Sequence, residues 1–415
     1  MALLEPSRAA HLAARIGRVL FVNGADSQHV SRAVAGVAGD MGHAAHVLVT
    51  SEAVLVTVGT NEQFCTKVGQ AFSSPSVNMG RLTAVNELLE EVKLGELDAD
   101  AIEGRLDDIE ASRGRYPVGL VVLGVTVTTA ALTKLFGATW AVVAASLVSG
   151  LVSALLRRWM PSVWSNQFGD AFVVAILSGL TAVIVLRFYP DESPVLALTA
   201  AGMILVPGVP LINGVREVTS GYAGNGVARL TTGIATVLAI GFALFTVSFV
   251  TGAVLPVNAA PGSLQVPEDL LFAGLAAVGF ALLFNVPPKA ICFCVIAGMT
   301  SHGLRTLFEH AGLALPISSL LGALSAGLIA RLGAQIHDVP AVAFAFPGVV
   351  ALIPGSYGFR AGIAGLQIMA QGAEASPALV ATMLSLIITT IVTTSAIAIG
   401  LVLAFSGPAQ DGRRR

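Results

Sequence analysis

The chain has 415 residues, of which 55% are hydrophobic and 12% are charged, with a formal net charge of -2 at pH 7. Soluble domains carry about 25% charged residues, so this composition excludes an ordinary soluble protein. The charge balance also excludes a strongly basic nucleic-acid binder. Charged residues are concentrated in residues 1–115, whereas residues 116–407 are almost entirely apolar. We therefore predict a small soluble domain followed by a large membrane domain.

Residues 1–115 show first helical and then strand periodicity. Apolar residues recur every three or four positions in four segments, which predicts helices near 7–21, 28–42, 82–92 and 102–109. Alternation with period two predicts short strands at 47–49, 54–58 and 64–68. Gly59 and Asn61 fit a hairpin turn, and Asp98 is expected to cap the last helix. The expected fold is a small α/β domain of order helix, helix, strands, helix, helix.

The polar residues of this domain do not form a catalytic motif. His29, Ser31 and Cys65 could supply a base and nucleophiles, but the sequence has no nucleophile elbow, paired metal ligands or phosphate-binding glycine loop. We therefore favour a structural or regulatory role and predict no catalytic residue, cofactor or metal site. A membrane-anchored hydrolase stays open as the alternative of another class. The first 20 residues lack the apolar core of a signal peptide, so the domain is expected in the cytoplasm.

The apolar region contains ten stretches of the length that a membrane-spanning helix needs, about 20 residues. They lie near 116–136, 138–157, 168–188, 194–214, 227–254, 268–286, 288–307, 316–334, 338–356 and 376–406. With a cytoplasmic N-terminus, eleven Lys and Arg residues fall on the inside and four on the outside, namely Lys134, Arg187, Arg305 and Arg360. This bias predicts that both termini are cytoplasmic.

The two halves of the membrane region resemble each other. The fourth span contains Leu205-Val206-Pro207-Gly208, and the ninth contains Leu352-Ile353-Pro354-Gly355. Five spans per half is an odd number, so consecutive copies must have opposite orientations, as in the inverted repeats of secondary transporters. We therefore predict repeats at 116–257 and 258–407, followed by a basic tail at 408–415.

A Pro-Gly pair inside a spanning helix interrupts its hydrogen bonding, because proline lacks an N–H and glycine tolerates the altered dihedral angles. The freed backbone groups must find partners in protein or in a wet cavity. A matched pair of such breaks predicts a substrate pathway. Ionisable groups at membrane depth are often functional, and Asp170 and His302 are the candidates for proton coupling.

Three groups of motifs carry a family resemblance. The segment 205–217, with Gly221 after it, resembles the signature of the threonine/serine exporter family, and the start at Leu82-Thr-Ala-Val-Asn86 is similar to the end of that family's soluble domain. The motifs Phe284-Asn-Val-Pro-Pro288, Ala330-Arg331 and Leu352-Ile-Pro-Gly-Ser356 resemble the smaller C-terminal membrane module, here fused to the first.

The resemblance implies an exporter of threonine and serine in a bacterial inner membrane, driven by the proton motive force through alternating access. Its partners are then a small polar metabolite and the lipid bilayer, with a homo-oligomer left open. Relatives associated with succinate make dicarboxylate export the alternative. The resemblance carries over these pathway residues: Pro207, Gly208, Pro210, Asn213, Arg216, Glu217, Pro354, Gly355 and Arg360.

Overall fold

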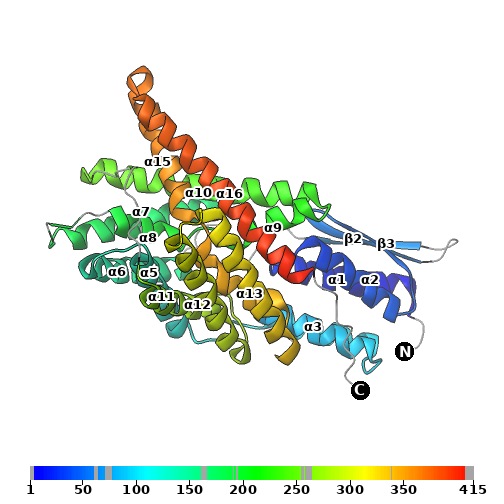
Figure 1. Cartoon of the computed structure of the whole chain (residues 1–415). Coiled ribbons are helices and arrows are strands. Elements are labelled where there is room, and N and C mark those ends of the chain that lie inside the picture. The colour runs from blue at the N-terminus through cyan, green and yellow to red at the C-terminus, as the bar shows by residue number, and fades with distance from the viewer. Residues whose placement is uncertain are drawn as a thin grey trace.

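The computed structural model of the chain describes residues 4–59, 64–70, 77–159, 166–189, 191–192, 195–253, 257, 264–337 and 339–406. Two parts lie side by side in Figure 1, an N-terminal α/β unit (residues 4–111) on the right and a helical bundle (residues 118–406) on the left. We call the end of the bundle that contacts the α/β unit the near end and the opposite end the far end.

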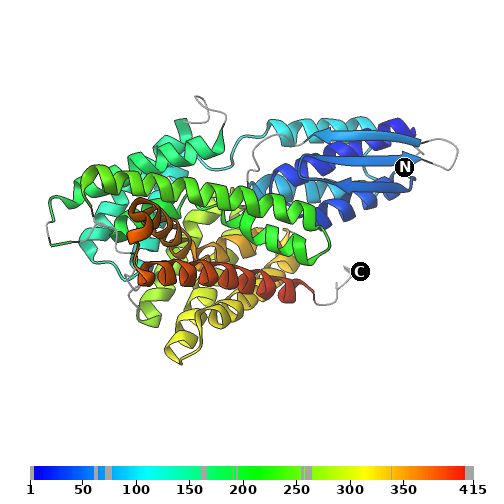
Figure 2. The same ribbon diagram turned by 90° about the horizontal axis from the view of Figure 1, so that it is seen from above.

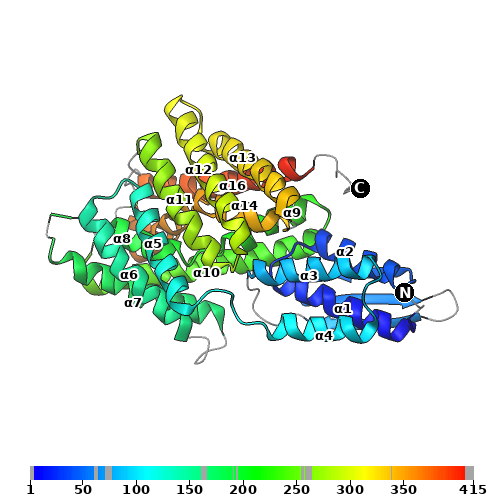
Figure 3. The same cartoon turned by 90° about the horizontal axis from the view of Figure 1, so that it is seen from below.

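The α/β unit has the predicted order of elements. They are α1 (Pro6–Val22), α2 (Ser27–Asp40), β1 (Ala45–Val49), β2 (Ala53–Gly59), β3 (Phe64–Gln70), α3 (Met79–Lys93) and α4 (Ala99–Ala111). The strands form an antiparallel sheet of order β1-β2-β3. Its β2 side chains alternate, so that Val54, Val56 and Val58 are buried, and Figure 3 shows α3 and α4 beside α1.

Local sequence signals explain the helix ends of this unit. Asp98 accepts a hydrogen bond from the backbone N–H of Ala101 at 2.8 Å, which confirms its predicted role as the cap of α4. Asp26 caps α2 in the same way through the N–H of His29. The predicted turn residue Asn61 and the predicted tail 408–415 lie outside the described residues.

The bundle contains twelve described α-helices. They are α5 (Val118–Leu135), α6 (Trp140–Trp159), α7 (Gln167–Leu186), α8 (Val195–Met203), α9 (Gly208–Thr219), α10 (Ala223–Thr251), α11 (Val266–Leu283), α12 (Pro288–His310), α13 (Leu315–His337), α14 (Ala341–Val349), α15 (Gly355–Gln371) and α16 (Pro377–Phe405). Figure 2 shows α10, the long green helix, which begins beside the α/β unit and extends along the bundle.

Among the described residues, eight helices are long and apolar enough to cross a membrane, and a ninth span results if α14 and α15, bent by 46°, are joined. The fourth predicted span corresponds to α8 and α9, which are 9 and 12 residues long and interrupted at Pro207. The chain is thus a polytopic membrane protein, while the total of ten spans stays a prediction.

One predicted boundary is wrong. We expected the ninth span to end near residue 356, but α15 begins at Gly355 and continues to Gln371. The segment is rich in glycine and polar residues, so its low hydropathy resembles that of a loop. It forms a helix because the break at Pro354 gives it a new N-terminus, and because it packs against α10 and α16.

The helices of the two halves correspond closely. The helices α5, α6 and α7 start at residues 118, 140 and 167, and α11, α12 and α13 start at 266, 288 and 315, a constant difference of 148. Equivalent glycines also make equivalent contacts. Gly150 of α6 lies against Thr129 of α5, and Gly298 of α12 lies against Ala277 of α11. These positions also differ by 148, so the helix pairs pack alike.

The glycine contacts predict the effect of a larger side chain. A Cβ at Gly298 would lie 2.7 Å from the Cβ of Ala277, whereas a Cβ at Gly119 of α5 would meet open space. Overpacking costs about 1–3 kcal/mol, so G298V should lower the melting temperature of the detergent-solubilised protein. The matched variant G119V should leave it nearly unchanged, and equal melting temperatures for the two variants would contradict this packing.

Candidate functional site

The two helix breaks have nearly the same backbone conformation. Pro207 has φ -77° and ψ 66°, and Pro354 has φ -76° and ψ 49°. In each, the glycine after the proline donates to the carbonyl two residues earlier, at 2.8 Å from Gly208 to Val206 and at 2.7 Å from Gly355 to Ile353. This is an inverse γ-turn with proline as its central residue. Proline suits this position because its ring fixes φ, and because the hydrogen bond of the turn is donated by the following glycine and not by the central residue.

The breaks also contact each other across the bundle. A Cβ at Gly208 would collide with Ile353, and a Cβ at Gly355 would lie 3.2 Å from Val206. Val206 and Ile353 are equivalent in their own halves, so the two contacts are reciprocal. From this point α9 runs towards the α/β unit and α15 runs away from it (Figure 1). The positive N-terminal ends of two half-helices therefore face each other inside the bundle.

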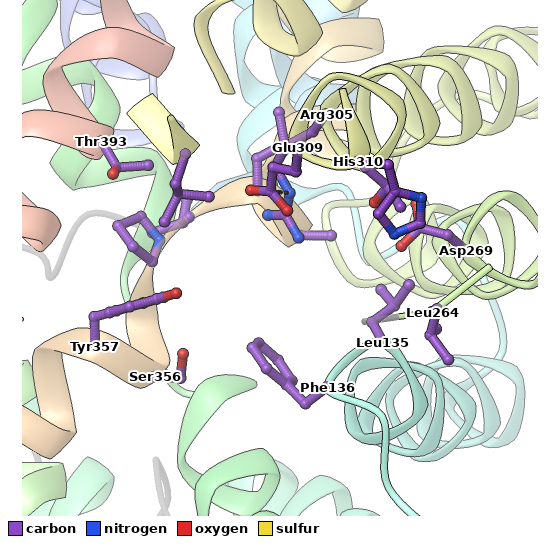
Figure 4. Close-up of a pocket in the computed structure, with 16 residues that line it drawn as sticks. Leu135, Phe136, Leu264, Asp269, Arg305, Glu309, His310, Ser356, Tyr357 and Thr393 are labelled. Carbon is purple, nitrogen blue, oxygen red and sulfur yellow. Dashed lines mark ion pairs between the residues drawn. The ribbon is translucent and has the colours of Figure 1, made fainter. Parts of the chain in front are cut away.

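A cavity of about 110 Å³ extends from the second break towards the far end. Its volume suits several water molecules or one small metabolite. Polar side chains come from α11, α12, α15 and α16, and Figure 4 shows how they surround the space. They are Asp269, Arg305, Thr306, Glu309, His310, Ser356, Tyr357 and Thr393.

Arg305 is the arginine in this wall. Its Nε lies 3.9 Å from Oε1 of Glu309, one helical turn further along α12. The same Nε is buried and has no hydrogen-bond acceptor among the described residues. A guanidinium in this state can bind a carboxylate through charge-assisted hydrogen bonds.

A buried histidine stands behind the cavity wall. Nδ1 of His302 lies 2.7 and 2.8 Å from the two carboxylate oxygens of Asp269, and the side chains are 2% and 3% exposed. Asp269 itself lines the cavity. The pair connects the predicted His302 to the site through a carboxylate that the sequence prediction missed, although an aspartate in the first turn of an apolar helix was a visible signal.

The other predicted pathway residues lie in two places. Pro207, Gly208, Pro354 and Gly355 form the breaks, and Pro210 lies in the first turn of α9. Arg360 lies one turn beyond the cavity, where it donates to the carbonyl of Val257 and faces the Tyr357 ring.

Asp170 is not brought together with His302. It lies in the first turn of α7, outside the described cavity wall, and its Oδ1 has no hydrogen-bond partner among the described residues. Its predicted part in proton coupling stays a prediction.

Asn213, Arg216 and Glu217 of α9 instead face the α/β unit. Arg216 lies 3.1 Å from the carboxylate of Asp26, and Asn213 donates to the carbonyl of Gly24 at 3.0 Å. Burial raises the pKa of Asp26, but Arg216 and the His29 N–H lower it further than burial raises it. Its pKa is therefore below the usual value, so this pair is lost only in strong acid, as pH falls through that lowered pKa.

Glu217 is the centre of this interface. Its side chain is 1% exposed, lies 3.1 Å from Nε of Arg229 and accepts hydrogen bonds from the N–H and Oγ of Ser27 at 2.9 and 2.8 Å. Buried ion pairs need this number of partners to offset their desolvation. The α/β unit is thus fixed to the first half of the bundle through a half-helix that begins at a break.

The second half of the bundle is bound to the same unit. The N–H of Met79 donates to the carbonyl of Phe284 at 2.8 Å. In the segment that follows the unit, the N–H of Arg115 donates to the side chain of Asn285 at 2.7 Å. Asn285 has φ 56°, a left-handed conformation that asparagine tolerates better than most residues. This turn between α11 and α12 is the Phe284–Pro288 motif.

Apolar spanning helices, paired helix breaks and a polar cavity between the helices define a membrane transport protein. The chain belongs to the threonine/serine exporter family. Residues 11–251 match the family described as "Putative threonine/serine exporter", and residues 269–406 match the family described as "Threonine/Serine exporter, ThrE". This family is one of transporters and not of enzymes.

Three curated relatives illustrate the similarity. The threonine/serine exporter of Corynebacterium glutamicum is 22% identical over 83% of this chain and 73% of its own length. A protein of Haemophilus influenzae named "Uncharacterized protein" is 34% identical over 34% of this chain and 46% of its own length. "Probable succinate transporter subunit YjjP" of Klebsiella aerogenes is 30% identical over 54% of this chain and 79% of its own length. No solved structure matches the chain.

The interface predicts that E217Q destabilises the protein. Removing one charge of a buried pair costs about 3–5 kcal/mol, so the melting temperature should fall and the Ser27 amide should exchange its hydrogen faster. Glu90, whose side chain is 71% exposed, supplies the control variant E90Q. If both variants unfold at the same temperature with unchanged exchange at Ser27, the Glu217 network does not fix the α/β unit.

Proposed function

We propose that this protein exports small amino acids such as threonine and serine across a bacterial inner membrane. The observation that carries the proposal is the cavity beside the second break, which places Arg305 near two carboxylates and the N-terminus of α15. An amino acid is a zwitterion and needs partners of both signs. Arg305 and the backbone amide of Ser356 can bind its carboxylate, and Glu309 or Asp269 its ammonium group.

Hydroxyl groups in the same wall suit the side chains of threonine and serine. Ser356, Tyr357 and Thr393 face the cavity (Figure 4), and Oγ1 of Thr393 is buried without a partner among the described residues. A site that has hydroxyl partners selects a substrate hydroxyl strongly, because its own polar groups would otherwise stay unpaired.

Dicarboxylate export is the second candidate, and the similarity to the succinate-named relative supports it. The charges of the cavity favour the amino acid. The cavity wall contains one arginine and the two acidic residues Asp269 and Glu309. The negative charge that a dianion would meet there is therefore at least as large as the positive charge. A zwitterion leaves the balance of charge in the cavity unchanged.

The architecture in this proposal is an inverted repeat of five spans in each half, 116–257 and 258–407, preceded by a cytoplasmic α/β domain at 1–115. The constant offset of the helix starts, the matched γ-turns and the reciprocal contacts at the breaks support it. Both termini are then cytoplasmic and the far end faces outward. The halves rock about the paired breaks to give alternating access.

Proton coupling falls to Asp269 and His302 in this scheme. Buried acid–base pairs inside transport proteins are common proton relays, and histidine titrates near physiological pH. Asp269 faces the cavity with His302 behind it, so a proton from the outside can reach the pair through the same space that releases substrate.

Binding of threonine should depend on Arg305. In purified protein, R305Q should weaken threonine binding at least tenfold, because a charge-assisted hydrogen bond is lost. The control R187Q removes an exposed arginine after α7 and should bind like the parent protein. Titration calorimetry with threonine and with succinate separates the two candidates. Binding of succinate but not threonine would overturn the amino-acid proposal.

Transport driven by the proton gradient should require Asp269, whereas substrate exchange should continue without it. In proteoliposomes, D269N should abolish threonine transport driven by a pH gradient while threonine counterflow continues at a reduced rate. Exchange needs no net proton movement, and Glu309 can still hold the ammonium group of the substrate. E268Q, the neighbouring acid in the first turn of α11, is the control. Unchanged gradient-driven transport in D269N would remove Asp269 from the proton pathway.

A further inference from the structure

Each half of the bundle has an arginine at the same position of its repeat. Arg157 of α6 and Arg305 of α12 differ by 148 positions, the offset that relates the helix starts. In the helices α5–α7 and α11–α13 they are the only charged residues at equivalent positions. The other ionisable residues of the cavity have no such counterpart. Asp269 corresponds to Val121 and His302 to Ala154.

The two arginines are in different states. Arg157 donates from Nη1 to the carbonyl of Ile204 at 3.1 Å. Ile204 directly follows α8, so its carbonyl belongs to the last turn of a broken helix and lacks an intrahelical donor. Counted back from the proline of each break, the residue equivalent to Ile204 in the second half is Ala351, which lies in the 3-10 turn before the second break.

Arg305 lies near that equivalent carbonyl but is engaged differently. Arg305 and Ala351 both line the cavity. The Nε of Arg305 has no acceptor among the described residues, and Glu309 lies 3.9 Å away. The first half is thus closed onto its broken helix, while the second half leaves a cavity and an available guanidinium.

We propose that Arg157 and Arg305 exchange these roles during transport. In the structure Arg157 holds the carbonyl of Ile204 and closes the near side, and Arg305 is available for a carboxylate. In the opposite state Arg305 binds the carbonyl of Ala351 and closes the far side. Arg157 then leaves Ile204 and becomes a second carboxylate site that faces the near side. This inference rests on the proposed function for the carboxylate as its ligand.

The closely matched backbones of the two breaks make this exchange feasible. The hydrogen bonds Val206 to Met203 and Ile353 to Val350 are 3.1 and 3.2 Å, so each half offers its arginine a carbonyl in the same surroundings. A mobile guanidinium can replace one oxygen acceptor by another, since carbonyl and carboxylate oxygens both accept its N–H groups. The same side chain therefore serves as latch in one state and as ligand in the other.

The test measures the far-side cavity in the absence of substrate. Ser356→Cys places a thiol in the wall, and its labelling by a membrane-impermeant maleimide reports how often the cavity is open. R157Q removes the near-side latch, so labelling should slow about tenfold. R305Q removes the far-side latch of the opposite state, so labelling should be as fast as in the parent or faster. The double variant should return to the parent rate, because both states lose one latch.

R158Q is the matched control, because Arg158 is the exposed neighbour on the same helix. The parent protein without the introduced cysteine corrects for Cys65, Cys292 and Cys294. If R157Q labels at the R158Q rate, or if the double variant labels more slowly than R157Q, the exchange is overturned. Should R157Q not give a monodisperse protein, R157K retains a donor and should label within about threefold of the parent. A tenfold fall in R157K would overturn the latch.

Failure of the proposed function would be visible separately. The labelling shifts need no transported metabolite, so they test the exchange even if threonine is not the substrate. Protection of the introduced thiol by threonine in the S356C parent background tests the substrate. Shifted rates without protection would support the exchange and contradict the amino acid.

Discussion

The structure depends on one constraint, that a backbone interrupted inside a bilayer must find hydrogen-bond partners within the protein. Both interruptions meet it with the same inverse γ-turn at a proline, which satisfies the following glycine N–H locally. Each glycine also leaves the space that the opposite break fills with Val206 or Ile353. The two half-helices α9 and α15 therefore start from one point and diverge, and the cavity lies where α15 begins.

The α/β unit is joined mechanically to this point. It binds α9 through Glu217, Arg216 and Asn213, and it binds the turn between α11 and α12 through Met79 and the segment at Arg115. Since α9 begins at Gly208, movement of the unit is transmitted along a single rigid helix of 12 residues to the first break. The unit contacts both halves at the near end, so any separation of the halves there must break or displace one of these two sets of bonds.

Sequence periodicity and turn chemistry predicted most elements, because apolar spacing and Pro-Gly pairs are local signals. The strands, the Asp98 cap and both breaks were recognised in this way. The partners of Arg216 and Glu217 in the α/β unit were not, because Asp26 and Ser27 lie some 190 positions away and the interface has no local signature. Arg157 was counted as an inside charge that ends a span. Its bond to Ile204, a tertiary contact without a local signature, gives it a role that the exposed Arg158 lacks.

The two halves have similar backbone conformations but different ionisable residues, and this difference bears on the direction of transport. Equivalent γ-turns give two states of similar geometry, while Asp269, His302 and Glu309 occur only in the second half. In the proposed cycle, a proton arriving from outside would reach the carboxylates that hold the ammonium group of the substrate. Protonation removes that attraction, so proton uptake and substrate release compete for one site. A fully symmetric transporter would have the same carboxylates on both sides. The ammonium group could then be held as firmly after the change of state as before it, so proton uptake and substrate binding would no longer compete at one side only.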